Sequence, residues 1–261
     1  MLFAILLMLQ SSPAVAQKPL PTLNELQFEE CLTMAQRDPS AAIVDASLWV
    51  QQGGDYLAKA CQGFALASDF RFAEAIGLLN DAAQGAESHA DNRAARFWAQ
   101  AGNAAIAADM PGDALSALDK ALLLPVLTKT ERADIEIDRA RTLVMLNRPD
   151  EAAIALTNAR QLGPENGAAW LLSATLARRL GKLADGLGFI QTAATLLPRD
   201  PAVALEAGNI AIAAGDESSA RKQWEQVLAI APASRQANTA RTQLAALEAT
   251  SDRPAEPVQS R

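Results

Sequence analysis

The chain has 261 residues, half of them apolar but only 5% aromatic, and a formal net charge of −7 at pH 7. The apolar residues are chiefly alanine and leucine, which are strong helix formers. Runs of β-branched residues with alternating polarity are nearly absent, so the composition argues against a sheet. The chain shows no basic stripe, which argues against nucleic-acid binding, and its acidity is typical of a well-solvated surface.

The N-terminal residues have the pattern of an export signal. Residues 2–9 form a continuous apolar run, followed by a polar break and the small residues Ala14-Val15-Ala16. This order predicts a signal peptide over residues 1–16, cleaved after Ala16. The run is shorter than the roughly 20 apolar residues that cross a bilayer. We therefore expect a periplasmic or otherwise exported protein that does not span the membrane after cleavage. The lack of Lys or Arg before the run does not fit, and the alternative is a buried first helix.

The predicted export bears on the state of the two cysteines of the chain, Cys31 and Cys61. An even pair in an oxidising compartment predicts a disulfide. In the chain-entropy model, closing a loop of this length stabilises the fold by about 3–4 kcal/mol. Two unrelated buried thiols are the alternative. The single histidine, His89, lies far from both cysteines in the sequence, so we expect no metal site.

Three prolines keep a constant interval of 34 residues. Pro164, Pro198 and Pro232 each close a block whose small and large residues recur at the same slots. Such a period indicates a solenoid of stacked helix pairs instead of one compact core. Three abutting units begin at Ala133, Gly167 and Pro201, and two earlier units begin near Tyr56 and Ala95.

Small residues recur at two slots of every unit. The eighth and twentieth slots hold only Gly or Ala: Gly63, Gly102, Ala140, Ala174 and Gly208, then Ala75, Ala114, Ala152, Gly186 and Ala220. We expect the backbones of the two antiparallel helices nearly to touch at these slots, with a large residue in slot twenty-four filling the groove between the helices. Proline in slot thirty-two ends the second helix, because proline cannot continue the hydrogen-bond ladder.

This pattern resembles the tetratricopeptide repeat family, whose hallmark is W-x2-L-G-x2-Y, then A-x3-F, then P. Trp98 with Gly102 matches the first half best, and the three prolines match the ending. The resemblance covers residues 56–234 as about five repeats. It implies an all-α, right-handed superhelical solenoid of antiparallel helix pairs. A generic alanine-rich bundle is the alternative, but it would not keep this register through three abutting units.

The ends of the chain depart from the repeat. Residues 17–55 are expected to form a capping helix pair, since terminal units meet water on one face. If this pair stacks like the others, Cys31 lies on a helix beside the one that carries Cys61. Residues 235–249 predict a closing helix, and the polar, proline-broken residues 250–261 predict a disordered tail.

No catalytic constellation is visible. One histidine and two predicted disulfide partners leave no nucleophile–base couple, and the sequence contains neither a phosphate-binding loop motif nor H-E-x-x-H. We expect a protein that is not an enzyme and that uses no cofactor.

In the family that the chain resembles, the first helix of each unit lines a concave face. Here the slots that face inward hold polar candidates for a binding groove: Arg96, Asn103, Asp138, Arg141, Thr175, Arg178 and Asn209, with Arg179 beside them. Four of these residues share slot nine, which predicts a polar ladder able to hydrogen-bond an extended peptide. Ordinary solvated helix surface is the alternative. The carboxylate clamp of the chaperone-binding members is not carried over, because Ala99, Ala168 and Leu172 occupy several of its slots.

The resemblance implies a non-catalytic, exported adaptor that binds a protein or peptide partner in its groove, in bacterial envelope assembly. The alternative is a structural or accessory subunit of a cell-wall or polysaccharide enzyme or export complex. Such a subunit would be held by its convex face or by its N-terminal cap.

Overall fold

The computed structural model describes residues 20–251, and within that range the chain forms 13 α-helices and no strand. The predicted signal peptide and residues 252–261 of the predicted tail lie outside the described residues. In chain order the helices are α1 (Leu23–Arg37), α2 (Pro39–Gln51), α3 (Tyr56–Ser68), α4 (Phe72–Ser88), α5 (Ala94–Ala107), α6 (Pro111–Leu123), α7 (Lys129–Met145), α8 (Pro149–Leu162), α9 (Gly167–Arg179), α10 (Leu183–Leu196), α11 (Pro201–Ala213), α12 (Glu217–Ile230) and α13 (Arg235–Ser251).

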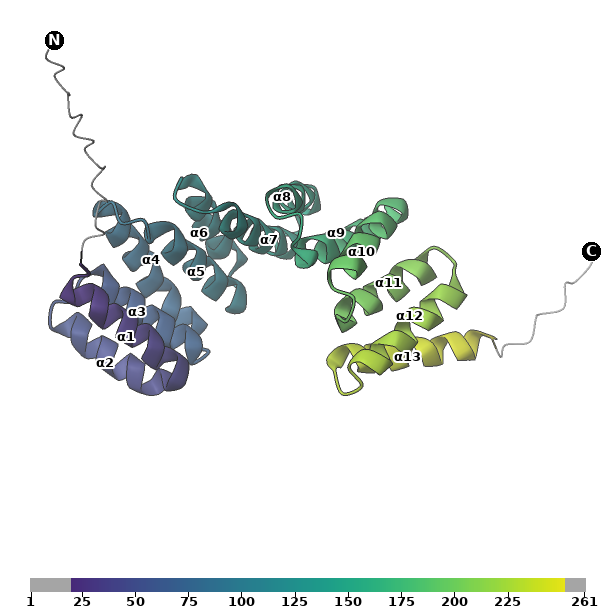
Figure 1. Cartoon of the computed structure of the whole chain (residues 1–261), viewed down its shortest axis with the longest axis horizontal. Coiled ribbons are helices and arrows are strands. Elements are labelled where there is room, and N and C mark those ends of the chain that lie inside the picture. Colours follow the sequence, from purple (N-terminus) through teal and green to yellow (C-terminus); the bar gives the residue numbers. More distant parts are fainter. Residues whose placement is uncertain (1–19, 252–261) are drawn as a thin grey trace, which may run out of the picture.

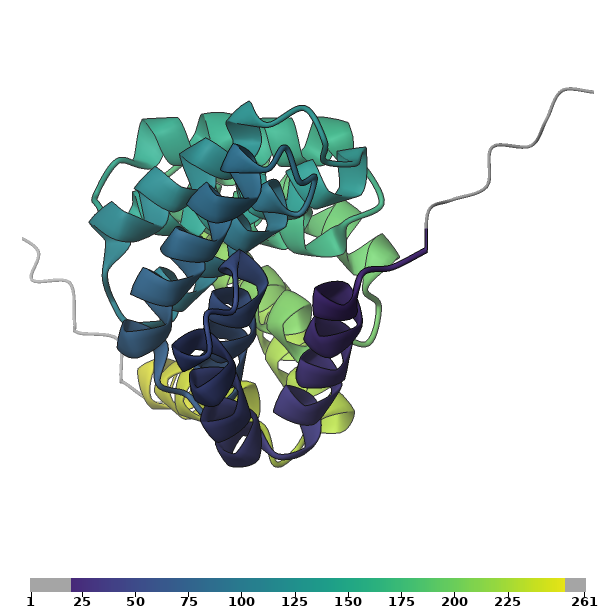
Figure 2. The same cartoon turned by 90° about the vertical axis from the view of Figure 1, so that its left-hand side faces the viewer.

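The helices stack into an arch. Each helix packs on the next one along the chain, so that α1–α3 form one foot of the arch and α11–α13 the other (Figure 1). In the view turned by 90°, the α1–α3 end lies in front of the α11–α13 end, with the middle helices above both (Figure 2). The chain is therefore an all-α solenoid of antiparallel helix pairs. No helix within residues 20–251 combines the length and the apolar character that a membrane span needs.

The helix pairs follow the predicted period. The first helices α3, α5, α9 and α11 begin at or next to the expected unit starts, and α8, α10 and α12 each end two residues before the repeating proline. One boundary differs, because α7 begins at Lys129, four residues before Ala133. The reason is a capping box in which Thr128 and Glu131 bond each other's backbone N–H, which starts the helix one turn earlier.

The turn inside each of the five repeats places one residue in the left-handed region. These residues all fall in slot fifteen: Phe70 (φ 61°), Asp109 (φ 57°), Asn147 (φ 55°), Gly181 (φ 71°) and Gly215 (φ 83°). The next amide then bonds back across the helix end, as Arg148 N does to Leu143 O at 2.8 Å. This closure satisfies a carbonyl that the end of the helix would otherwise leave without a partner.

Slot eight is small for a reason that differs from the predicted one. A Cβ added to Gly102 would lie 2.7 Å from Leu118 Cγ, and one added to Gly63 would lie 2.7 Å from Leu79 Cγ. The large residue of slot twenty-four thus rests directly on slot eight. This side chain, and not the backbone of the partner helix, leaves no room for a Cβ. Slot twenty is less tight: a Cβ on Gly186 would lie 3.5 Å from the carbonyl oxygen of Ala174, which is ordinary contact.

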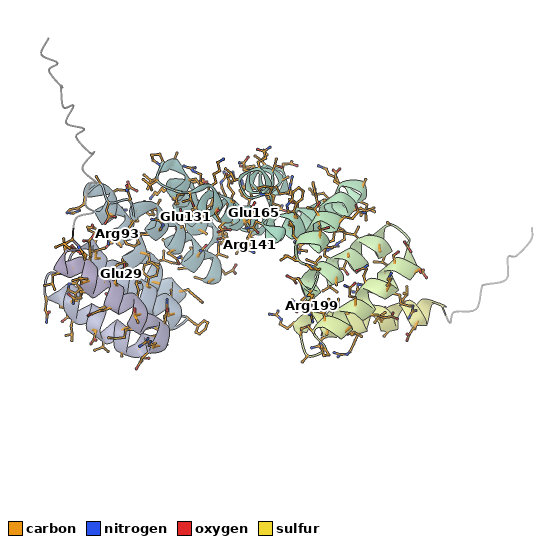
Figure 3. The ribbon with its side chains drawn as sticks, in the orientation of Figure 1. Glu29, Arg93, Glu131, Arg141, Glu165 and Arg199 are labelled. Atoms are coloured by element: carbon orange, nitrogen blue, oxygen red, sulfur yellow. A yellow bond between two sulfur atoms is a disulfide. The ribbon has the colours of Figure 1, made fainter. Side chains whose placement is uncertain are left out.

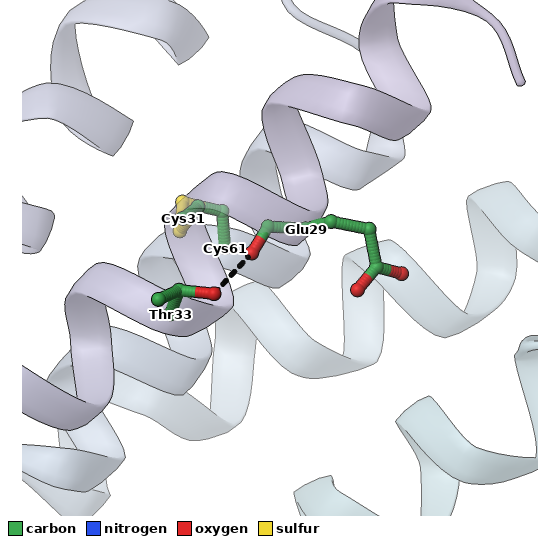
Figure 4. The surroundings of a disulfide bond; sticks show 4 residues. All are labelled: Glu29, Cys31, Thr33 and Cys61. Atoms are coloured by element: carbon green, nitrogen blue, oxygen red, sulfur yellow. Dashed lines mark hydrogen bonds between the residues drawn. A yellow bond between two sulfur atoms is a disulfide. The ribbon is translucent and has the colours of Figure 1, made fainter.

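The N-terminal helices are tied to the array by covalent and polar contacts. Helix α1 lies beside α3, and the structure joins Cys31 to Cys61 by a disulfide, with Cα atoms 5.9 Å apart (Figure 4). Asn24 Nδ2 donates to Asp55 Oδ2 at 2.9 Å near the start of α3. These contacts hold the cap at the end of the solenoid, where fraying would otherwise be easiest.

Candidate functional site

An open groove of about 350 Å³ lies among α5, α7 and α9. Figure 3 places Arg141 on the side of α7 that faces the opening of the arch. The floor of the groove is apolar and two exposed arginines border it. The lining residues are Ile106 of α5, Ala140, Arg141, Val144 and Met145 of α7, Leu156 of α8, and Leu172, Thr175, Leu176 and Arg179 of α9.

Helical periodicity gathers these side chains. Arg141, Val144 and Met145 stand at i, i+3 and i+4 along α7, and Leu172, Thr175, Leu176 and Arg179 continue the same spacing on α9. Residues so spaced share one face of a helix. Since α7 and α9 occupy equivalent places in successive repeats, their two stripes form the opposing walls of one groove.

The two arginines of the groove differ in how their charge is balanced. Arg141 Nη1 donates to Asp138 Oδ1 at 2.7 Å, and the Asp138 side chain is only 20% exposed. Burial raises the pKa of Asp138, against the attraction of Arg141. Arg179 is exposed and forms no ion pair with any residue in the range 20–251. Arg179 is thus the cation of this groove that has its charge free for a ligand.

Two other predicted groove residues hold the repeats together. Arg178 of α9 bonds the buried Glu206 of α11 at 2.6 and 3.3 Å. Asn209 donates to the same carboxylate at 3.3 Å and accepts a bond from the Trp224 indole N–H at 3.3 Å. Because Glu206 is 7% exposed, this network joins α9, α11 and α12 inside the structure and leaves these side chains engaged.

The remaining candidates lie nearer the N-terminal half. Arg96 Nε donates to Glu131 Oε1 at 2.6 Å, linking the starts of α5 and α7. This bond, with the Thr128 backbone N–H, lowers the pKa of Glu131 to about 2. Asn103 is exposed but does not line the groove. Of the predicted residues, the structure therefore brings Arg141, Thr175 and Arg179 into one groove, with Asp138 supporting Arg141. The polar ladder does not run along the whole length of the groove.

The apolar floor is the part that the sequence interpretation missed. Val144 and Met145 follow the slot-nine residue Arg141 by three and four positions, and Leu172 precedes the slot-nine residue Thr175 by three. Met145 is 40% exposed. The available signal was an apolar residue three or four positions before or after a slot-nine residue on a first helix. The polar slots alone could not indicate this floor.

No protein-family model matches the sequence, and neither does any curated protein. Solved structures do resemble the fold. PilF of Pseudomonas aeruginosa is 15% identical with a TM-score of 0.67, covering 84% of this chain and 97% of its own. The quorum sensor NprR of B. thuringiensis is 13% identical with a TM-score of 0.68, covering 89% of this chain and 72% of its own. YrrB, a TPR protein with an unusual peptide-binding site, is 19% identical with a TM-score of 0.55, covering 75% of this chain and 96% of its own.

At these identities the similarity shows the fold. The chain is an all-α solenoid with the tetratricopeptide-repeat fold.

Proposed function

We propose that this protein is a non-catalytic scaffold that binds a protein or peptide partner in the groove among α5, α7 and α9. The observation that carries the proposal is an apolar floor bordered by Arg141 and by the unpaired Arg179. A preformed groove loses little conformational entropy on binding. Guanidinium groups at its border favour carboxylates through charge-assisted hydrogen bonds. The similarity to a fold that includes the peptide-binding YrrB supports this reading.

The partner that fits best is an extended segment with a large apolar residue next to an acidic one. The volume of about 350 Å³ lies at the lower end of the range usual for ligand sites. It suits one or two side chains of a peptide better than a large cofactor. The apolar side chain would lie on Met145 and Leu172, and the acidic residue would lie near Arg179.

We propose that this binding takes place outside the cytoplasm, in bacterial envelope assembly. The signal-peptide pattern over residues 1–16 supports export, and the pairing of Cys31 with Cys61 is compatible with an oxidising compartment. Mass spectrometry of the protein from cells tests this part directly. We expect a mature chain that begins at Gln17 and has Cys31 and Cys61 joined in a disulfide. An intact N-terminus with two free thiols would contradict export.

The groove itself can be tested with a photo-crosslinking residue. Placed at Met145, it is expected to capture a defined partner, whereas the same residue at Ile154, which is 60% exposed on α8, is expected to capture none. Arg141→Glu with Arg179→Glu should abolish the capture, and the control Arg235→Glu on exposed α13 should leave it unchanged. Capture that survives the double charge reversal would overturn the groove as the binding site.

A second candidate function rests on the N-terminal cap. Val44 and Leu48 of α2 are 59% and 49% exposed, and their spacing of four places them on one helix face. An accessory subunit could be held to a larger complex by this face. A crosslinker at Leu48 would then capture the partner, and Val44→Lys with Leu48→Lys would prevent association while the groove variants remained silent.

A further inference from the structure

A second, smaller cavity lies against a neighbouring face of α9, between the second helices α8 and α10. Its volume is about 140 Å³, and it shares only the buried Leu156 and Leu176 with the groove. Its walls combine apolar residues, among them Leu180 and Phe189, with the cations Arg160 and Lys182. A peptide in the groove would therefore leave this cavity accessible.

Arg160 is fixed in this cavity by neutral groups. Its guanidinium carbon lies 4.4 Å from the Phe189 ring centroid and 5.3 Å from that of Trp170, a cation–π arrangement. Its Nη1 donates to the Ser173 hydroxyl, and Nη2 donates to Thr157 Oγ1 at 3.2 Å. The Ser173 and Thr157 hydroxyls donate to backbone carbonyls one turn earlier in their own helices, at 2.7 and 2.8 Å. Both hydroxyls therefore act as acceptors toward Arg160. The side chain is thus held in one position without a negative charge.

The charge of Arg160 is uncompensated within residues 20–251, where no carboxylate pairs with it. Three other partly buried arginines, Arg93, Arg139 and Arg178, each meet a carboxylate within 2.7 Å. A fourth, Arg132, also lacks a carboxylate partner in the described structure, but it donates to the backbone carbonyls of Leu122 and Leu124 and lines neither this cavity nor the groove. Burial lowers the pKa of Arg160, which reflects the loss of water around the cation. A desolvated guanidinium without a counter-charge, facing a cavity, has hydrogen-bond donors and charge to offer an anion.

Two further charged groups line the cavity. Lys182 is exposed at its edge and adds a second cation. Asp185 is also exposed there, and it forms no ion pair with Arg160 or Lys182 in the described structure. The two cations outnumber this carboxylate, so the cavity favours an anionic occupant whose charge lies on the Arg160 side.

We propose that this cavity binds a glutamate side chain of a partner protein. The carboxylate would bond Arg160 and Lys182, and the methylene groups would lie on Leu180 and Phe189. The size supports a side chain over a whole small molecule, because a cavity of roughly 150 Å³ takes one benzene-sized group and ligand pockets usually exceed about 300 Å³. With the groove left accessible, the scaffold could hold two acidic segments at once.

The test uses two blocked dipeptides, acetyl-Leu-Glu-amide and the neutral acetyl-Leu-Gln-amide, titrated into the full chain. The NMR signals of the Arg160 Nε–H and the Trp170 indole N–H report binding. The glutamate peptide is expected to shift both signals saturably, and the glutamine peptide to shift neither. Equal shifts with both peptides, or shifts that do not saturate, would overturn the proposal.

Variants separate binding from packing. Lys182→Gln should weaken binding about two- to fivefold, as for an exposed ion pair, and Arg160→Gln should weaken it more than about tenfold. Asp185→Asn should strengthen binding, because it removes a repelling carboxylate. Both Lys182 and Asp185 are exposed, so these variants keep the test valid if Arg160→Gln unfolds the chain. Lys222→Gln serves as the control and should have no effect. Unchanged affinity in both the Lys182 and the Asp185 variant would show that Arg160 only packs.

Discussion

Two carboxylates of α7, Glu131 and Glu136, stand five residues apart in opposite environments. Glu131 caps the helix and bonds Arg96, which lowers its pKa to about 2. Glu136 is 9% exposed in slot four, where the neighbouring repeats carry Trp98 and Trp170. Its Oε1 accepts from Asn158 Nδ2 at 3.0 Å, but Oε2 has no hydrogen-bond partner among the described residues. Burial raises the pKa of Glu136.

We predict that Glu136→Gln stabilises the protein at pH 7. The folded-state pKa of Glu136 lies above the ordinary value of 4.5, so the folded protein binds this proton more tightly than the unfolded chain does. The stabilisation linked to this proton is fully present below pH 4.5 and is lost as the pH rises through the folded-state pKa. At pH 7 the wild type therefore carries a buried charge that the amide lacks. Urea unfolding should show a higher midpoint for the variant at pH 7 and a smaller difference at pH 4.

Glu131→Gln is the matched control on the same helix, with the opposite sign. The folded-state pKa of Glu131 is lowered, so the stability that its carboxylate contributes is present above pH 4.5 and is lost as the pH falls toward about 2. This variant should be less stable at pH 7, by about 1 kcal/mol for a weakened cap. A destabilised Glu136→Gln at pH 7 would show instead that the attraction of Arg139, 3.9 Å from Oε2, outweighs the burial.

At the scale of the element, the helix pairs that have glycine in slot eight are built by one large residue resting on that glycine. Leu118 of α6 lies on Gly102 of α5, and Trp224 of α12 lies on Gly208 of α11 in the same slots. The glycines are therefore needed for space and not for backbone freedom. In the turns the need is the reverse: Gly181 and Gly215 have positive φ and open space around them.

We predict opposite effects for alanine at two glycines in helix interiors. At Gly188 of α10 an added Cβ meets nothing within 4 Å, so Gly188→Ala should stabilise by about 0.5–1 kcal/mol through helix propensity alone. At Gly102 the added Cβ would clash with Leu118 at 2.7 Å, so Gly102→Ala should destabilise by about 1–3 kcal/mol. Thermal unfolding of both variants measures the contrast. A stabilised Gly102→Ala would show that the helix pair opens without cost.

At the scale of the whole molecule, stability is shared between neighbours along the arch. A solenoid has no central core, so each pair depends on the pairs beside it, and the ends are the weakest points. The N-terminal foot counters this with the disulfide between α1 and α3 and with polar contacts that include the ion pair of Arg93 with Glu25 at 3.1 Å.

We predict that removing the disulfide weakens one end of the arch selectively. Cys31→Ala with Cys61→Ala opens a loop with a sequence separation of 30, worth about 3–4 kcal/mol in the chain-entropy model. Hydrogen exchange should show lost protection in α1 and α2, with α9 to α13 nearly unchanged. An equal loss of protection along the whole chain would mean that the arch unfolds as one cooperative unit, contrary to this view.

Much of the architecture could be predicted from the sequence, because it depends on local spacing. Pro164, Pro198 and Pro232 mark the ends of second helices, and the Gly and Ala slots mark where helices of a pair meet. The early start of α7 was missed, although Thr128 and Glu131 carry the capping-box signature. The groove could be predicted only in part: Arg141, Thr175 and Arg179 line it, whereas Arg178 and Asn209 are engaged with Glu206.

By itself the sequence determined the class of fold, since helix propensity, small residues and proline act within one repeat and recur at a fixed interval. Only the tertiary structure decided which polar residues stay free for a partner. Whether an arginine meets a carboxylate depends on residues one or two helices away: Arg178 finds Glu206 on α11, while Arg179 and Arg160 find none within the described chain. Those distances arise when repeats stack, and no period along the chain encodes them.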